Sequence, residues 1–374
     1  MCPANDPAAP PHPTQDMPPE ASAPWSALTA GVSLIAAVAL IWLLYFTSDV
    51  LIPIALALLI WSLVNAIRAG VERVSIAGRH PPGWLAMALS LALIVWGLYE
   101  FGALVTRNVQ DVIAAAPVYQ ANIERMLPQL LALIGLEELR DLGRIVEDIN
   151  VGTLISSIAG TLSGFVGNTA IILIYVMFLL VEQQVFGRKI DAMFRSERRR
   201  AEARIVARTI VEQTQNYLRL KTAMCFLTAG VTYVVLESFA VDFAGFWAVV
   251  VFLLNYIPTV GSILGAIFPA LLALLQFGDW QLALVVLAIL GFFAQFVVSN
   301  LVEPRFMGSH LNMSPLAIIL SLALWGSLWG VAGAFLCVPI MVILMIVTAH
   351  FPQTRWIAVL LSNDGDIVEN TTNA

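Results

Sequence analysis

Seven residues that lie within or beside apolar segments are the ones in this sequence best suited to contact a small solute. They are Asn255, Tyr256, Pro258, Thr259 and Gly261 in NYIPTVG, and Gln295 and Asn300 in QFVVSN. Polar side chains within a membrane span are costly, so they usually face a cavity or a partner helix. Pro258 removes a backbone donor and disfavours helix at the residue before it, which leaves carbonyls unpaired. We therefore predict a substrate-binding site made of these residues. A tight structural turn near the membrane surface is the alternative interpretation of NYIPTVG.

The sequence offers little for catalysis or metal binding. Its four histidines are isolated and its three cysteines are scattered. We find no phosphate-binding loop, no His-Glu-x-x-His and no nucleophile with a base at a recognisable spacing. We expect no enzyme activity, no metal and no cofactor. Glu100 is the candidate for coupling an ion, because it is an ionisable group in a predicted span.

The composition predicts an all-α polytopic membrane protein. Of the 374 residues, 59% are hydrophobic and 12% are charged, whereas soluble domains have about 25% charged residues. A span needs about 20 apolar residues, and apolar stretches of that kind predict about eight membrane segments. Amphipathic helices outside and on the cytoplasmic side are expected in addition.

The chain divides by composition into seven regions. They are a disordered Pro-rich tail at 1–26, three spans within 27–105, extracytoplasmic amphipathic helices at 106–150, a fourth span at 151–181, a basic cytoplasmic helix at 182–221, a transporter core at 222–352 and a cytoplasmic tail at 353–374. The core begins with a fifth span at 222–240 and contains a further span at 280–302. We expect Pro117, Pro128 and Gly135 to divide the extracytoplasmic helices from one another.

Two segments of the core, 244–277 and 314–350, are predicted to be broken helical hairpins. The first holds NYIPTVG between two apolar arms, and the second holds glycines at 326, 330 and 333 followed by Pro339. Unpaired backbone at membrane depth is tolerated only where protein or water surrounds it. Secondary transporters commonly place solute and ions at such breaks.

The distribution of basic residues predicts the orientation. Ten of the nineteen Lys and Arg residues lie between Arg188 and Lys221, and such residues are enriched on the cytoplasmic side. Both termini are then cytoplasmic. Glu303 and Arg305 would pair with each other or meet lipid headgroups at the end of their span. We expect contact with membrane lipid and none with nucleic acid.

Small residues in the fourth span favour close helix packing. Gly160, Gly164 and Gly167 lie near one face of this span and include a G-x-x-x-G spacing. Faces of this kind allow helix backbones to approach one another in lipid.

Several motifs in order resemble the autoinducer-2 exporter family of permeases. They are YIPTVG, GAIFPALLAL, QFVVSNLVEPRFMG, LNMSP and GSLWGVAGAFLCVP, running from about residue 216 to the second hairpin. The first half of the chain matches only in hydropathy and loop layout. The resemblance implies a bacterial inner-membrane exporter of small polar molecules, including the quorum-sensing signal autoinducer-2. It also implies a homo-oligomer, with a pentamer expected.

Two positions depart from the family pattern. The family commonly has a glutamate between the Gln and Asn that correspond to Gln295 and Asn300, and this sequence has Val298 there. An aromatic residue is usual where this sequence has Thr259. The first departure weakens ion coupling, because a coupling ion normally needs an ionisable group within the membrane.

The sequence therefore favours an inner-membrane transporter of a small polar solute, such as an autoinducer-2-like signal. A sodium (or lithium)/proton antiporter is the first alternative. An oligomeric membrane pore or scaffold is the second.

Overall fold

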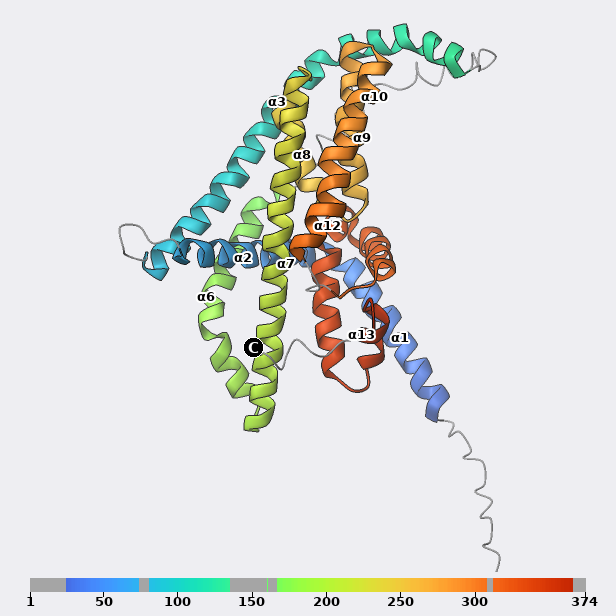
Figure 1. Ribbon diagram of the computed structural model, residues 1–374. Coiled ribbons are helices and arrows are strands. Elements are labelled where there is room, and N and C mark those ends of the chain that lie inside the picture. Colours follow the sequence, from blue (N-terminus) through green and yellow to red (C-terminus); the bar gives the residue numbers. More distant parts are fainter. Residues whose placement is uncertain (1–24, 74–80, 135–159, 161–166, 308–311, 366–374) are drawn as a thin grey trace, which may run out of the picture. The chain divides into compact units, whose positions relative to one another are not determined.

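The computed structural model describes residues 25–73, 81–134, 160, 167–307 and 312–365. Every regular element within these residues is a helix (Figure 1), which confirms the all-α prediction. Seven of the helices are long and apolar enough to cross a membrane. The protein is therefore a multi-pass membrane protein.

The chain forms two compact units. The first ends at Thr47 and contains α1 (Trp25–Phe46), where the rings of Trp42 and Phe46 stack at 5.2 Å. The second unit begins at Ser48 and contains all the other helices. It starts with α2 (Ser48–Arg73).

Helix α7 (Glu197–Ser238) runs through the middle of the second unit (Figure 1). Four other elements pack against it: α2, α8, η1 and α12. Its 42 residues combine the predicted basic helix and the predicted fifth span. No glycine or proline lies between Glu197 and Ala229, so the sequence contains no helix breaker where the charged part meets the apolar part.

Helix α3 (Gly83–Ile134) likewise runs without a break for 52 residues. The predicted third span and the first extracytoplasmic helices are thus one helix, and the division expected at Pro117 and Pro128 is wrong. Beyond the span, Tyr119 packs with Leu272, Ala273 and other apolar residues of the second unit. This packing stabilises the helix on both sides of Pro117 and outweighs the hydrogen bond that the proline removes. Residues 135–150 lie outside the described part.

Both predicted hairpins contain a break. The first consists of α8 (Ala244–Leu254) and α9 (Val260–Phe277), and residues 255–259 between them are not helical. The second lies within α12 (Pro315–His350), whose two arms meet at Gly330 with φ 60° and ψ −139°. The predicted span between them is α10 (Trp280–Ile289), the π-helix η1 (Leu290–Val302) and the short α11 (Glu303–Met307).

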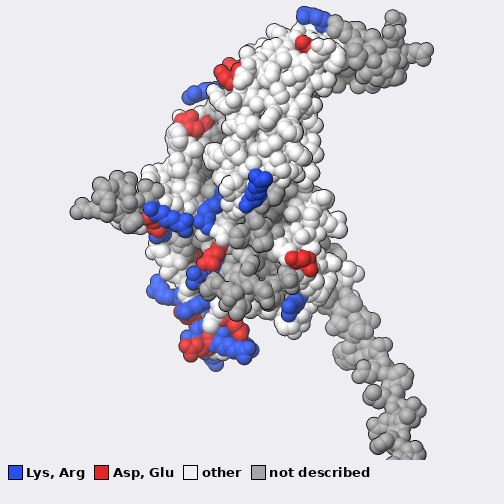
Figure 2. Space-filling view, viewed as in Figure 1, with Lys and Arg blue, Asp and Glu red and all other residues white. Residues whose placement is uncertain are grey.

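Charged residues gather where α6 (Thr169–Met193) turns into α7 (Figure 2). Arg204 pairs with Asp191 across this turn, and Arg198 and Arg208 pair with acids one turn further along α7. Most of the rest of the visible face is uncharged (Figure 2). The chain ends its described part with α13 (Arg355–Leu361), which packs against α12.

Candidate functional site

The first bend is a tight turn that glycine alone can complete. After α8, the Ile257 N–H donates to Leu254 O at 2.8 Å, and the Gly261 N–H donates to Ile257 O at 3.1 Å. Thr259 takes a positive φ of 62° between them. A Cβ on Gly261 would lie 1.7 Å from Leu254 O and 2.5 Å from its carbonyl carbon. The bend therefore depends on a residue without a side chain at 261.

Two buried amide side chains lie against this hairpin. Asn255 is 5% exposed and Gln295, from η1, is 6% exposed. Ser262 Oγ is 3.4 Å from Asn255 Oδ1, and a Cβ on Gly265 would lie 2.8 Å from Gln295 Nε2. Gly265 therefore makes room for the Gln295 amide. We call Asn255, Ser262, Gly265 and Gln295 the hairpin site.

The hairpin site contains polar atoms that find no partner among the described residues. Asn255 Nδ2 and both amide atoms of Gln295 are buried there without a hydrogen bond. Leaving such a group unpaired costs about 1–3 kcal/mol, and most buried polar atoms in proteins are paired. The site thus offers hydrogen-bonding atoms that a polar ligand or an ordered water could use.

Gln295 lies on a helix of unusual pitch. η1 is a π-helix of 13 residues, although the sequence predicts an ordinary span there. π-helical turns are rare and occur frequently at functional sites. The buried residues of η1 are Leu290, Ala294, Gln295 and Val298. Val298, where the family resemblance leads us to expect a glutamate, is 3% exposed.

The first bend contacts both α7 and the second hairpin through Tyr256. The Tyr256 hydroxyl is 2.7 Å from Thr222 Oγ1 on α7. The ring of Tyr256 stacks on Phe335 of α12, with centroids 4.5 Å apart and planes at 29°. Both hairpins and α7 therefore meet at this tyrosine.

A partly buried ion pair lies close to this meeting point, and it was not predicted from the sequence. Lys221 Nζ on α7 is 2.8 Å from Glu303 Oε1, and the two side chains are 12% and 17% exposed. Glu303 thus pairs with Lys221 and not with Arg305 as expected. The two residues are far apart in the sequence, so their spacing gives no signal.

The second bend repeats the construction of the first. Gly330 takes the positive φ, and a Cβ on Gly333 would lie 1.9 Å from Trp325 O. The two arms are joined near the bend by Ser321, whose hydroxyl donates to Cys337 O at 3.1 Å.

The remaining predicted residues are not among those of the hairpin site. Pro258 is partly buried at the bend and Thr259 is exposed. Asn300 is exposed, and its amide donates to Phe296 O one turn earlier at 3.1 Å. Glu100 is exposed on α3.

The glycines predicted to pack helices are only partly described. No atom of the described residues lies within 4 Å of a Cβ built on Gly160 or Gly167. Gly164 lies outside the described residues, as does much of the predicted fourth span. Close packing at this face stays a prediction.

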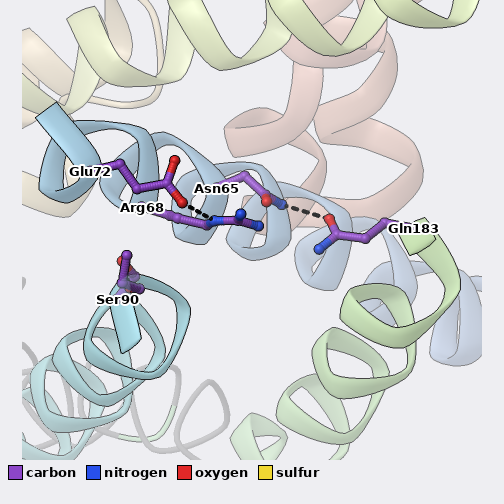
Figure 3. Close-up of polar contacts among 6 residues, drawn as sticks. Asn65, Arg68, Glu72, Ser90 and Gln183 are labelled. Carbon is purple, nitrogen blue, oxygen red and sulfur yellow. Dashed lines mark hydrogen bonds and ion pairs between the residues drawn. The ribbon is translucent and has the colours of Figure 1, made fainter. Parts of the chain in front are cut away.

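A polar cluster between α2 and α6 was also missed. Trp61 Nε1 donates to Gln183 Oε1 at 2.8 Å, and Asn65 Nδ2 donates to the same oxygen at 3.2 Å. Figure 3 shows Asn65 and Gln183 pointing toward one another, with Arg68 and Glu72 paired further along α2. Trp61 and Asn65 are four residues apart and therefore share a helix face. That spacing was the available signal.

The opposite end of the first hairpin is held by a second polar cluster, the distal cap. Asn122 of α3 donates to Leu275 O and Gln276 O, each at 2.9 Å. The Tyr119 hydroxyl donates to Asp242 Oδ2 at 3.2 Å. Gln276 donates to Ala240 O at 2.9 Å and accepts from the Asp242 N–H at 2.7 Å. Burial, followed by the charge and hydrogen bond of Asp242, raises the pKa of Tyr119 well above its ordinary value.

Comparison with known proteins matches residues 34–353 to the family described as AI-2E family transporter. The chain is 30% identical over 331 residues to the AI-2 transport protein TqsA of Escherichia coli (strain K12), covering 85% of this chain and 91% of TqsA. It is also 30% identical over 330 residues to a Haemophilus influenzae protein named as a transport protein, covering 85% and 92% of the two chains. YhhT of Escherichia coli (strain K12) is 27% identical over 308 residues, covering 79% and 83%.

Proposed function

The chain belongs to the AI-2E transporter family, and on that premise we propose that it carries a small polar solute across the bacterial inner membrane by way of the hairpin site. The single observation that carries this proposal is Gln295, which is buried against Gly265 with both amide atoms unpaired. A buried amide without a partner is stabilised when a passing solute hydrogen-bonds to it, because the free-energy cost of the unpaired group is then recovered. Irregular backbone beside it, at the first bend, is the arrangement that transporters use around solutes.

An autoinducer-2-like signal molecule is the first solute to try. The relative TqsA is named as an AI-2 transport protein, which supports this choice and a role in quorum sensing. The basic α6–α7 turn faces the cytoplasm in this proposal, because basic residues favour that side. A homo-oligomer, with five copies as the first hypothesis, follows from the family resemblance.

The antiporter alternative needs an ionisable group at the solute path. The polar groups of the hairpin site are two buried amides and a partly buried hydroxyl, and Glu100 is exposed on α3. We therefore place solute transport first. The pore or scaffold alternative has no observation of its own in the described residues.

The test is counterflow in proteoliposomes made from purified protein. Gln295→Met keeps the approximate volume but removes both unpaired polar atoms, so stability should stay equal or rise. Counterflow of the transported solute should fall about tenfold or more, the size of one or two lost hydrogen bonds.

Gln281→Met is the matched control, because Gln281 is exposed on α10. It should leave counterflow unchanged. Undiminished counterflow in the folded Gln295→Met variant would remove Gln295 from the solute path. No counterflow by the unmodified protein for any signal molecule or small metabolite would count against transport itself.

A further inference from the structure

A cavity of about 440 Å³ lies at the second bend, apart from the hairpin site. Trp329, Val331 and Ala332 of α12 line it, and these residues flank the non-helical Gly330. The starts of α2 and α6 supply the opposite walls. The break in α12 thus opens onto a space of the size that binds small molecules, about 300–1,000 Å³.

Among the described residues that line this cavity, Asp49 is the one that can ionise. It lies in the first turn of α2. No described residue offers Asp49 a hydrogen bond or an ion pair. An exposed acid at a helix start is ordinary on a soluble protein. Asp49 is exposed at the start of this apolar helix, so its carboxylate can reach a ligand that occupies the cavity.

The surroundings of Asp49 combine hydrogen-bonding groups with an apolar wall. Ser48 and Asn168 add a hydroxyl and an amide to the lining. Trp329 is 9% exposed. The remaining residues are apolar side chains of α2 and α6: Ile52, Pro53, Leu56 and Ile172. A carboxylate near an indole and aliphatic carbon suits an organic ammonium ion, whose charge needs an anion and whose carbon atoms need an apolar surface.

The size and charge of the cavity decide against two other ligand classes. A bare monovalent ion would leave most of 440 Å³ empty, since one water occupies about 30 Å³. An anion would meet the Asp49 carboxylate without a lysine or arginine in the lining to offset it. We propose that the Asp49 cavity binds a small organic ammonium ion, and that such cations are among the solutes the protein carries. The second part of this inference rests on the proposed function.

The experiment measures binding of radiolabelled choline, used as the probe, to the purified full-length protein in lipid nanodiscs at constant ionic strength. The unmodified protein should bind choline saturably. Asp49→Asn keeps the shape of the side chain and removes its charge, and it should weaken choline binding about tenfold or more. Glu237→Gln removes an exposed carboxylate on α7 and should leave choline binding unchanged.

The outcomes separate the alternatives. Equal choline affinity in the unmodified and Asp49→Asn proteins, both eluting as folded species, would overturn the proposal. Displacement of choline by sodium as effectively as by tetramethylammonium would do so too, because it would identify an inorganic cation site. A Trp329→Leu variant that binds choline more weakly would support the indole's part in the site.

Counterflow distinguishes failure of this inference from failure of the proposed function. If the protein shows counterflow of a neutral solute but its choline binding does not depend on Asp49, the transport proposal stands and the role proposed for this cavity is contradicted. Asp49-dependent choline binding without counterflow of any solute would establish the cavity as a binding site and contradict transport.

Discussion

Gly261 and Gly333 should tolerate no side chain, because each lies where a Cβ would meet a backbone carbonyl of its own hairpin. The built distances are 1.7 Å to Leu254 O for Gly261 and 1.9 Å to Trp325 O for Gly333. Backbone atoms cannot rotate away as a side chain can, so alanine must open the bend. Overpacking of this kind costs about 1–3 kcal/mol, and a contact with backbone belongs at or above the upper end.

Two other glycines of the same hairpins are matched controls. Nothing lies within 4 Å of a Cβ built on Gly245 or Gly326, and both lie within helical arms. Alanine in a helix is favoured over glycine by about 0.5–1 kcal/mol. Gly245→Ala and Gly326→Ala should therefore unfold at the temperature of the unmodified protein or above it.

Thermal unfolding of the four detergent-purified variants, followed by size-exclusion chromatography after heating, measures the difference. Gly261→Ala and Gly333→Ala should aggregate at clearly lower temperature than the two controls. Indistinguishable unfolding temperatures across the four variants would show that the bends are looser than the structure has them. That result would also contradict the close approach of Gly261 to Leu254 O and of Gly333 to Trp325 O.

Three further predictions concern the clusters around the hairpins. Lys221→Met should destabilise the protein by about 3 kcal/mol, because it leaves Glu303 buried without a partner, and Lys221→Met combined with Glu303→Leu should recover most of the loss. Asn122→Ala should cost about 1–3 kcal/mol by leaving two carbonyls of α9 unpaired, and hydrogen exchange should show faster opening at the distal cap. The folded state raises the pKa of Tyr119 above that of a tyrosine in the unfolded chain, which is about 10. The stability that this shift contributes is therefore fully present below about pH 10 and is lost as the pH rises further. Tyr119→Phe should flatten this alkaline loss, and an unchanged pH profile would contradict the burial of the phenol.

The breaks in the two hairpins could be predicted because their causes are local. Pro258 and Gly330 each act on the backbone within a few residues, and both segments are too long for one span. Membership of an all-α membrane class followed from composition alone.

The lengths of α3 and α7 could not be predicted in the same way. Pro117 alone predicts a division, and only the packing of Tyr119 on the core explains why α3 continues. Along α7, the change from charged to apolar residues was predicted to be the boundary of an element. It marks a change of environment within one helix.

The candidate site was predictable only in part. Asn255 and Gln295 were identifiable as polar residues in apolar segments. Their arrangement around Gly265 depends on how η1 packs on the first hairpin, which no spacing within either segment encodes. Asp49 was missed because its cavity is formed by three separate helices, and Lys221 was missed because its partner is 82 residues away.

The π-helical pitch of η1 bears on how Gln295 could change its surroundings. Each N–H in a π-turn reaches a carbonyl five residues back, and moving it to the carbonyl four residues back exchanges one hydrogen bond for another. A tightening of η1 would therefore rotate Gln295 about the helix axis without leaving backbone groups unpaired in lipid. A π-turn contains one residue more than an α-turn. Helix α10, directly before η1, has ordinary α-helical turns, so the extra residue of a π-turn could shift into it. The hairpin site thus has, beside the first bend, a helix in which Gln295 could turn by an exchange of backbone hydrogen bonds.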